Sequence, residues 1–186
     1  PVNNDARMLP IDALSAAGIY GKSSGKRFGK VSRLQKMKFT IGFRKANQQD
    51  IDFLLDLRRK TMSPHLRKAG IFMSEEQHLE RINEFFSDSH IILRDRKPIG
   101  LLKLGMKPGS LHIRQLQILP KYQGAGIGSK VLKVVKKRAL QLCVPVTLNV
   151  LLDNPARALY IRHGFQITKK TKLEYQMLCP LAVIAA

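Results

Sequence analysis

Three glycines within five residues, Gly124, Gly126 and Gly128, form the feature that most constrains how this chain can fold. Glycine lacks a Cβ atom, so the backbone of such a loop can adopt positive φ angles and approach a ligand closely. From Ser129 onward apolar residues recur at helical spacing, so the loop leads into a helix whose first N–H groups have no partner within the helix. Free N–H groups at the positive end of a helix dipole attract anions, and a pyrophosphate suits such a turn. The loop is therefore predicted to bind phosphate through its main chain.

Two common nucleotide-binding loops do not fit this sequence. A dinucleotide-binding loop requires G-x-G-x-x-G and an acidic residue about twenty positions later, whereas this loop reads G-x-G-x-G and is followed there by Leu148 and Asn149. A stretch similar to a Walker loop, residues 18–23, has two residues between its glycines where four are required. An ordinary glycine-rich turn remains as the alternative to a phosphate site.

Two motifs in order give the loop a more specific interpretation. Residues 123–128 have the pattern Q-x-x-G-x-G, and a second stretch, Asn154-Pro-Ala-Arg-Ala-Leu-Tyr-Ile-Arg-His-Gly-Phe165, follows an apolar strand-like run. Together they resemble the signature elements of the GNAT N-acetyltransferase family. The resemblance covers roughly residues 39–178 and is specific from Leu111 to Phe165. It implies the GNAT fold, with acetyl-CoA as co-substrate.

The periodicity of the chain is consistent with that fold, a mixed α/β (α+β) arrangement. We expect a largely antiparallel, twisted sheet with helices on both faces. Pro64 is expected to end the first helix, and Phe85 and Phe86 to face inward from the second. Strands are expected at residues 39–43, 90–94, 98–106, 111–119, 144–151, 165–167 and 173–177. Helices are expected at residues 47–63, 74–86, 129–141 and 154–163.

The strand before the loop contains a change of phase. Leu111 and Ile113 alternate correctly with each other, as do Leu116 and Ile118, but the two pairs differ by an odd number of positions. A β-bulge within residues 114–117 would restore a common apolar face, and bulges occur preferentially beside active sites. The alternative is an inward position that is simply polar.

The resemblance implies direct attack of a primary amine on the thioester of acetyl-CoA. Tyr160 stands where the family places the acid that protonates the thiolate, with structural packing of the ring as the alternative. His112 stands six residues before Ile118, where some family members carry a general base; water is the alternative. The N–H of Ile118 is the expected oxyanion donor. The expected cofactor-binding residues are Ile118, Gln123, Gly124, Ala125, Gly126, Ile127, Gly128, Ser129 and Asn154.

Charge indicates an anionic partner without identifying it. The formal charge is +20, and residues 97–186 carry fifteen Lys or Arg against Asp153 and Glu174. Coenzyme A and nucleic acid would both be attracted, so a basic RNA- or ribosome-associated binding protein with a vestigial or regulatory acyl-CoA pocket is the alternative function. The expected partner is an amine acceptor, either a small molecule or a protein amine, bound by a monomer or a homodimer. One acidic run, Glu76, Glu80 and Glu84, predicts a solvated helix face, with an amine-attracting rim as the alternative.

Residues 1–37 read as a separate segment. They are basic and show little apolar periodicity, which predicts a flexible extension before a GNAT domain at residues 38–186. The two cysteines, Cys143 and Cys179, form neither a disulfide framework nor a metal-ligand cluster, so no metal is expected. The sequence has no apolar run of membrane-spanning length, and a cytoplasmic location is expected.

Overall fold

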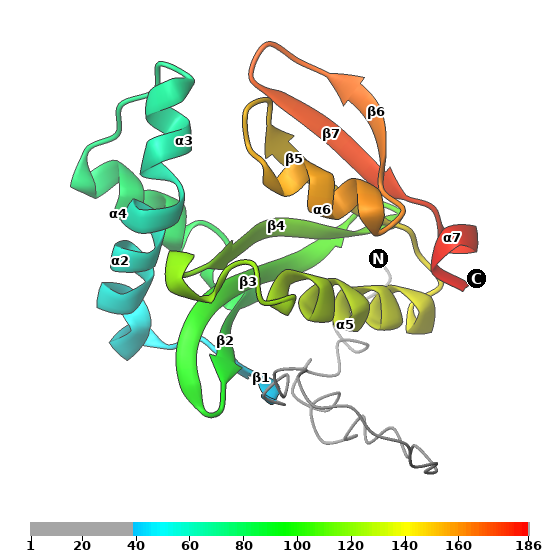
Figure 1. Cartoon of the computed structure of the whole chain (residues 1–186), viewed down its shortest axis with the longest axis horizontal. Helices are drawn as coiled ribbons and strands as arrows, with labels where there is room; N and C mark the ends of the chain where they lie inside the picture. The colour runs from blue at the N-terminus through cyan, green and yellow to red at the C-terminus, as the bar shows by residue number, and fades with distance from the viewer. Residues whose placement is uncertain (1–38, 186) are drawn as a thin grey trace, which may run out of the picture.

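The computed structural model describes residues 39–185, which form a seven-stranded sheet with helices on both faces (Figure 1). The extension predicted for residues 1–37 lies outside the described residues. The strands are β1 (Ile41–Lys45), β2 (Ser89–Arg94), β3 (Lys97–Lys107), β4 (Ser110–Ile118), β5 (Val146–Leu151), β6 (Gln166–Lys170) and β7 (Glu174–Cys179). The α-helices are α2 (Ile51–Thr61), α3 (Ser63–Lys68), α4 (Glu75–Asn83), α5 (Ile127–Gln141), α6 (Ala156–Arg162) and α7 (Leu181–Ala185). Three short 3-10 turns are η1 (Gln48–Asp50), η2 (Phe86–Asp88) and η3 (Pro120–Tyr122).

The sheet has the strand order β1-β2-β3-β4-β5-β7-β6. All neighbouring strands pair antiparallel except β4 and β5, which are parallel and joined through α5. A parallel pair requires such a crossover, whereas the antiparallel pairs β2-β3, β3-β4 and β6-β7 are joined by short turns. This arrangement confirms the predicted mixed, largely antiparallel sheet.

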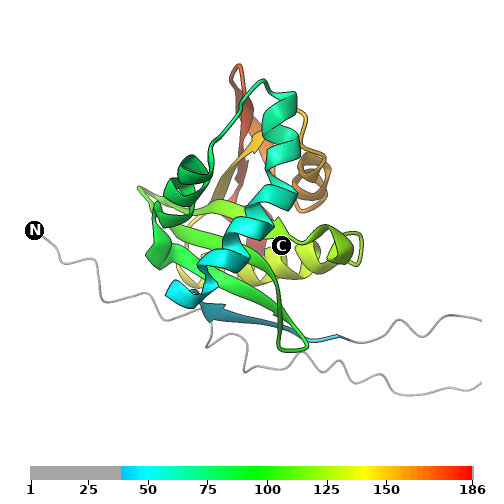
Figure 2. The ribbon, with the colours of Figure 1, turned by 90° about the vertical axis from the view of Figure 1, so that its left-hand side faces the viewer.

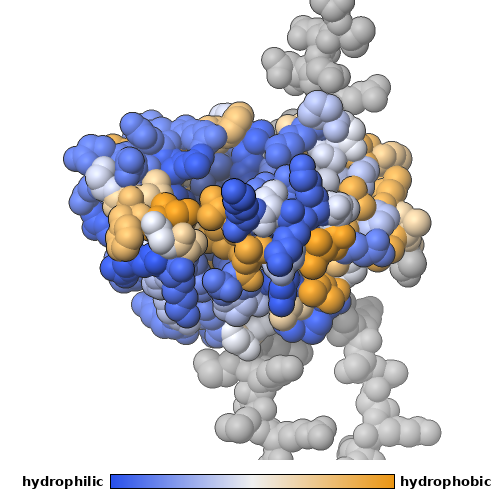
Figure 3. All heavy atoms as spheres, turned by 90° about the horizontal axis from the view of Figure 1, so that it is seen from above, coloured by the Kyte–Doolittle hydropathy of each residue, from blue (hydrophilic) through white to orange (hydrophobic). Residues whose placement is uncertain are grey.

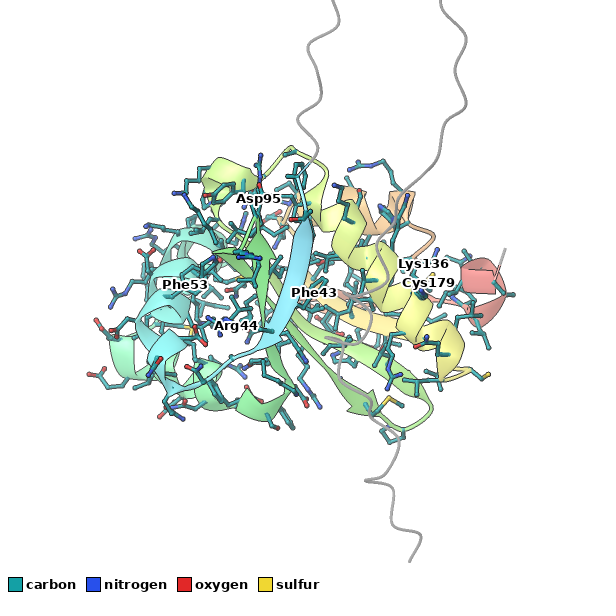
Figure 4. All side chains as sticks on the ribbon, turned by 90° about the horizontal axis from the view of Figure 1, so that it is seen from below. Phe43, Arg44, Phe53, Asp95, Lys136 and Cys179 are labelled. Carbon is teal, nitrogen blue, oxygen red and sulfur yellow. The ribbon has the colours of Figure 1, made fainter. Side chains whose placement is uncertain are left out.

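Successive side chains of the central strands pack in two separate hydrophobic clusters. Ile92 and Leu102 pack in the cluster that contains the inward side chains of α5, whereas Ile91 and Leu101 pack against α2 and α4. Because successive residues of a strand point to opposite faces, the two helix layers must lie on opposite sides of the sheet. Figure 2 shows α2 crossing the sheet in front with α5 to its side, and Figure 4 shows both helices flanking β1.

Pro64 starts a helix where the sequence predicted that it would end one. The chain turns at Met62 and winds on from Ser63, so that Pro64 lies in the first turn of α3. Proline is well tolerated there because the first N–H groups of a helix have no intrahelical acceptor. As a result the segment α2-α3 extends past β4 and supplies residues to the cavity described below.

The prediction that Phe85 faces inward is wrong. Helix α4 ends before it, Phe85 has a left-handed backbone (φ 51°), and its side chain is 51% exposed. The Arg114 guanidinium lies over its ring, 3.7 Å from the centroid, and donates to the Asp88 carboxylate from Nε at 2.7 Å. The Phe85 ring therefore packs over the ion pair of Arg114 and Asp88 and lies outside the hydrophobic core. Helix α4 begins with a capping box between Ser74 and Gln77, and Glu76 and Glu80 of the same helix are exposed, as expected for a solvated face.

A buried lysine holds the end of α4 against the sheet. Lys103 of β3 is 1% exposed, and its Nζ donates to the carbonyl oxygens of Arg81, Ile82 and Glu84 at 3.2, 2.9 and 2.6 Å. The last carbonyls of a helix lack intrahelical partners, and a cation at that end also interacts favourably with the helix dipole. Burial nevertheless lowers the pKa of Lys103 to about 8.

The apolar C-terminal segment forms α7 and packs on α5. Gly164, with φ +82°, makes room for this contact, because a Cβ there would lie 2.5 Å from Val183 Cγ1. Within residues 39–185, each helix is too short or too polar to cross a membrane.

The lowered pKa of Lys103 predicts a stability change with pH. Between about pH 8 and the ordinary lysine pKa near 10.4, the unfolded chain binds more protons than the folded chain, so the free energy of unfolding should rise with pH. Urea denaturation from about pH 7 to about pH 10 should show this rise in the wild type and in Lys107→Met, which replaces an exposed lysine of the same strand. It should be smaller in Lys103→Met. An equal rise in Lys103→Met would contradict the assignment.

Candidate active site

A cavity of about 400 Å³ opens where β4 and β5 part. Strands β4 and β5 pair only from Leu111 with Val146 to Ile113 with Leu148. Beyond that point β4 continues along β3 and β5 continues along β7, so the two strands separate. The cavity is lined by Thr61, Met62, His65, Leu116, Gln117, Ile118, Tyr122, Gln123, Gly124, Gly126, Ile127, Gly128, Ser129, Asn154, Pro155, Ala156, Leu159, Tyr160 and Arg162.

A bulge in β4 accompanies this separation. Lys103 pairs with Gln115 and Leu104 pairs with Ile113, which leaves Arg114 as the extra residue. The phase change in the sequence therefore marks a real bulge, as predicted. Because the bulge restores the alternation, Leu116 and Ile118 pack with the α5 cluster while Gln117 faces the α2 side with Leu101.

The end of β4 leaves a main-chain donor facing the gap. The N–H of Leu119 donates to the carbonyl of Ile99 at 2.9 Å. Main-chain groups alternate in direction along an antiparallel strand, so the N–H of Ile118 points away from β3 and toward the space between β4 and β5. The carbonyl of Ile118 accepts a hydrogen bond from Gln123 Nε2 at 2.8 Å, which ties the loop to the strand.

The three glycines of the loop are required for different structural reasons. Gly124 and Gly126 have φ angles of +74° and +77°, a region that strains other residues. Gly126 is the N-cap of α5, and no side chain caps this end, so the first N–H groups of the helix remain available to a ligand. Gly128 has an ordinary φ, but a Cβ there would lie 2.8 Å from Leu159 Cδ2, so this glycine allows α5 and α6 to approach.

The other predicted loop residues, Ala125, Ile127 and Ser129, differ in burial and in contacts. Ile127 is buried in the core and fixes the start of α5, whereas Ala125 is exposed and does not line the cavity. Ser129 Oγ lies 2.9 Å from His163 Nε2, which joins the start of α5 to the end of α6. The pKa of His163 is lowered by burial and by Lys136, Lys133 and Arg162. Its carbonyl is contacted by Lys136 and Cys179, labelled in Figure 4.

Helix α6 carries Tyr160 into the cavity. The Asn154 side chain accepts a hydrogen bond from the N–H of Ala156 at 2.9 Å and so caps the helix start. Tyr160 is 6% exposed, and its ring meets that of Phe165 edge-on at 5.7 Å. Burial raises the pKa of Tyr160 to about 12, so the hydroxyl keeps its proton throughout the neutral range.

His112 does not join this group. It lies buried on β4 before the bulge, does not line the cavity, and places Nδ1 2.9 Å from Thr147 Oγ1 on β5. Burial, with Lys107 and Arg114, lowers the pKa of His112 to about 4. The position predicted for a base is therefore occupied by a neutral histidine that links the paired ends of β4 and β5.

Sequence reasoning missed one wall of the cavity. Thr61, Met62 and His65 line it from α2, α3 and the turn between them, and Gln117 and Arg162, which were also not predicted, line it as well. His65 follows Pro64, where a helix end was expected, so no local pattern marks it as part of a site. None of the cavity residues is acidic, and within residues 39–185 no three His, Cys, Asp or Glu side chains are grouped to hold a metal ion.

Comparison with known proteins tests the fold and the family resemblance. The family model of the GNAT acetyltransferase domain matches residues 86–167. No curated protein matches the chain. A PaiA N-acetyltransferase from Thermoplasma acidophilum, solved with coenzyme A, is 20% identical with a TM-score of 0.61, covering 76% of this chain and 99% of that one.

Two further solved structures share the fold. An acetyltransferase from Thermus thermophilus is 20% identical with a TM-score of 0.61, covering 76% of this chain and 97% of that one. A ribosomal-protein alanine N-acetyltransferase from Escherichia coli is 15% identical with a TM-score of 0.58, covering 76% of this chain and 94% of that one. The matches confirm the resemblance that the two sequence motifs indicate.

The loop geometry predicts which glycine controls donor binding. Gly126→Val forces a β-branched residue into a left-handed conformation and places a side chain at the N-terminus of α5, so acetyl-CoA should no longer raise the melting temperature. Gly109→Val is the matched control, because Gly109 also has a positive φ (+69°) and open space but lies in the β3-β4 turn. Unchanged acetyl-CoA binding by Gly126→Val would contradict the loop assignment.

Proposed function

We propose that this chain, whose residues 86–167 match the GNAT acetyltransferase domain, transfers the acetyl group of acetyl-CoA to a primary amine by direct attack. The observation that supports this most is the coincidence of three features in one cavity. These are the separated strands β4 and β5, the uncapped start of α5, and the buried phenol of Tyr160. Each supplies a different requirement of acyl transfer.

The residues present fit acetyl-CoA as the donor. Main-chain N–H groups at the start of α5 suit a pyrophosphate, and no carboxylate lines the cavity to repel it. The gap between β4 and β5 suits an extended pantetheine chain, because main-chain groups of β4 face it unpaired by β5. The N–H of Ile118 is the group placed to stabilise a thioester oxyanion.

The reaction needs one bond formed, one broken and two protons moved. The amine nitrogen attacks the thioester carbonyl carbon, and the tetrahedral intermediate carries negative charge on its oxygen near the Ile118 N–H. Its collapse breaks the carbon–sulfur bond and releases a thiolate. Tyr160 is the group that gives the thiolate a proton, while the amine nitrogen loses one. The products are an N-acetyl amide and coenzyme A.

The acceptor is an amine of a small molecule or of a protein. A nucleic-acid-binding role, the alternative that the charge of +20 allows, gains no support from the family match or from the similar structures. Figure 3 shows a face that is largely hydrophilic with smaller hydrophobic patches. Residues 97–186 are strongly basic, and the phosphates of the donor are one anionic group that these residues would attract.

A panel assay tests the activity itself. The full chain is mixed with acetyl-CoA and with one acceptor from each class: a polyamine, an amino sugar, a peptide with a free N-terminus, and a peptide whose only amine is a lysine. Free thiol should appear with at least one acceptor and above the rate without acceptor. No release with any of them would overturn the proposed function.

Tyr160→Phe tests the proton donor. The variant keeps the ring and its contact with Phe165, so folding and acetyl-CoA affinity should persist while kcat falls by roughly 10² to 10⁴. Tyr175→Phe is the matched control, because Tyr175 lies on β7 outside the cavity and should keep wild-type kcat. An undiminished kcat in Tyr160→Phe on the best acceptor would remove Tyr160 from the mechanism.

A further inference from the structure

One wall of the cavity takes no part in binding acetyl-CoA in the proposed mechanism. Thr61, Met62, His65 and Gln117 form this surface, which we term the α2–β4 wall. In Figure 1, α2 and α3 lie to the left of β4, apart from α6, the helix that carries Tyr160. The amine must therefore approach from the α2–β4 wall if the donor occupies the loop side.

The amide of Gln117 is buried without a hydrogen-bond partner for its oxygen. The residue is 4% exposed, and Oε1 is an unpaired buried atom. Such an atom carries a desolvation cost that natural structures rarely leave uncompensated. Gln115, two residues earlier on the same face, also has a buried, unpaired Oε1, but its Nε2 donates to the carbonyl of Arg81 at 3.4 Å and it does not line the cavity.

His65 is the histidine that lines the cavity, and its Nδ1 is also buried without a hydrogen-bond partner. The hydroxyl of Thr61 is already used, because it donates to the carbonyl of Leu57 at 2.7 Å. Two polar atoms, Gln117 Oε1 and His65 Nδ1, therefore lie covered and unpaired in side chains that line the cavity. A half-turn of the imidazole or of the amide exchanges which polar atom faces the cavity without changing the space occupied.

We infer that His65 and Gln117 form the acceptor subsite, where the Gln117 carbonyl oxygen orients the amine and the His65 imidazole takes up its proton. An amine that attacks a thioester must lose one proton from nitrogen, and imidazole is a suitable acceptor near neutral pH. That proton goes to His65 and then to solvent, while Tyr160 protonates the departing thiolate. The inference rests on the proposed function.

The titratable side chains that line the cavity also limit which amines are suitable acceptors. Its titratable side chains are His65, Tyr122, Tyr160 and Arg162, with no carboxylate among the described residues that line it. A polyamine would bring additional positive charges into this space without a counter-charge. The cavity suits a primary amine whose neighbouring groups are uncharged, such as a monoamine or the N-terminus of a neutral peptide.

Gln117→Leu tests the orienting contact. This variant keeps the volume but removes both polar atoms, so KM for a neutral peptide N-terminus or a monoamine should rise about tenfold or more. The melting-temperature shift caused by acetyl-CoA should remain that of the wild type. Gln115→Leu is the matched control and should keep the wild-type KM. An unchanged amine KM in Gln117→Leu would overturn this part of the inference.

His65→Ala tests the proton acceptor through chemical rescue. The variant should lose roughly 10² to 10⁴ in kcat and regain part of it when imidazole is added to the buffer. His112→Ala, measured in parallel, should show no such rescue. An unchanged kcat in His65→Ala, or a loss that imidazole does not restore, would overturn the base assignment.

The wild-type assay separates this inference from the function on which it rests. Thiol release with the neutral peptide or the monoamine but little with spermidine supports the acceptor class, whereas preference for spermidine overturns it and leaves the acetyltransferase activity intact. No thiol release from acetyl-CoA with any amine overturns the proposed function and the inference together.

Discussion

The limited pairing of β4 with β5 is the constraint on which the site depends. Three residue pairs hold the strands together, and past Ile113 each strand follows a different neighbour. A continuous parallel pair would satisfy the main-chain groups of β4 and fill the space now available to a ligand. The extra residue, Arg114, sits at the point of separation and is held by Asp88 and Phe85. The strand is thus kept bent by contacts on its α4 side.

The two helices that follow these strands complete the site through close packing. Gly128 lets α5 and α6 approach, and Ser129 and His163 join them by a hydrogen bond. This fixes Tyr160 relative to the start of α5, where the anionic part of a donor would bind. Because both helices rest on one hydrophobic cluster, the main-chain amides at the start of α5 and the phenol of Tyr160 are positioned by the same core.

The glycine loop and the bulge could be predicted from sequence, whereas the side of the cavity formed by α2 and α3 could not. Gly124 and Gly126 can be recognised because positive φ angles favour glycine, and the bulge can be recognised because it shifts the alternation of apolar residues. His65 and Gln117 have no such local signature, since they come from distant segments that meet only in the fold. His112 has a suitable chemical type, but burial beside Thr147 removes it from the cavity.

We propose that the main chain at the end of β4 and the start of α5 binds acetyl-CoA. A titration of the ¹⁵N-labelled protein with acetyl-CoA, followed through backbone amide chemical shifts, tests this binding residue by residue. The largest shifts are expected at Ile118 and at residues 124–129, with small shifts in the β3-β4 turn at Gly109. Shifts concentrated outside the cavity, or none at saturating acetyl-CoA, would contradict it.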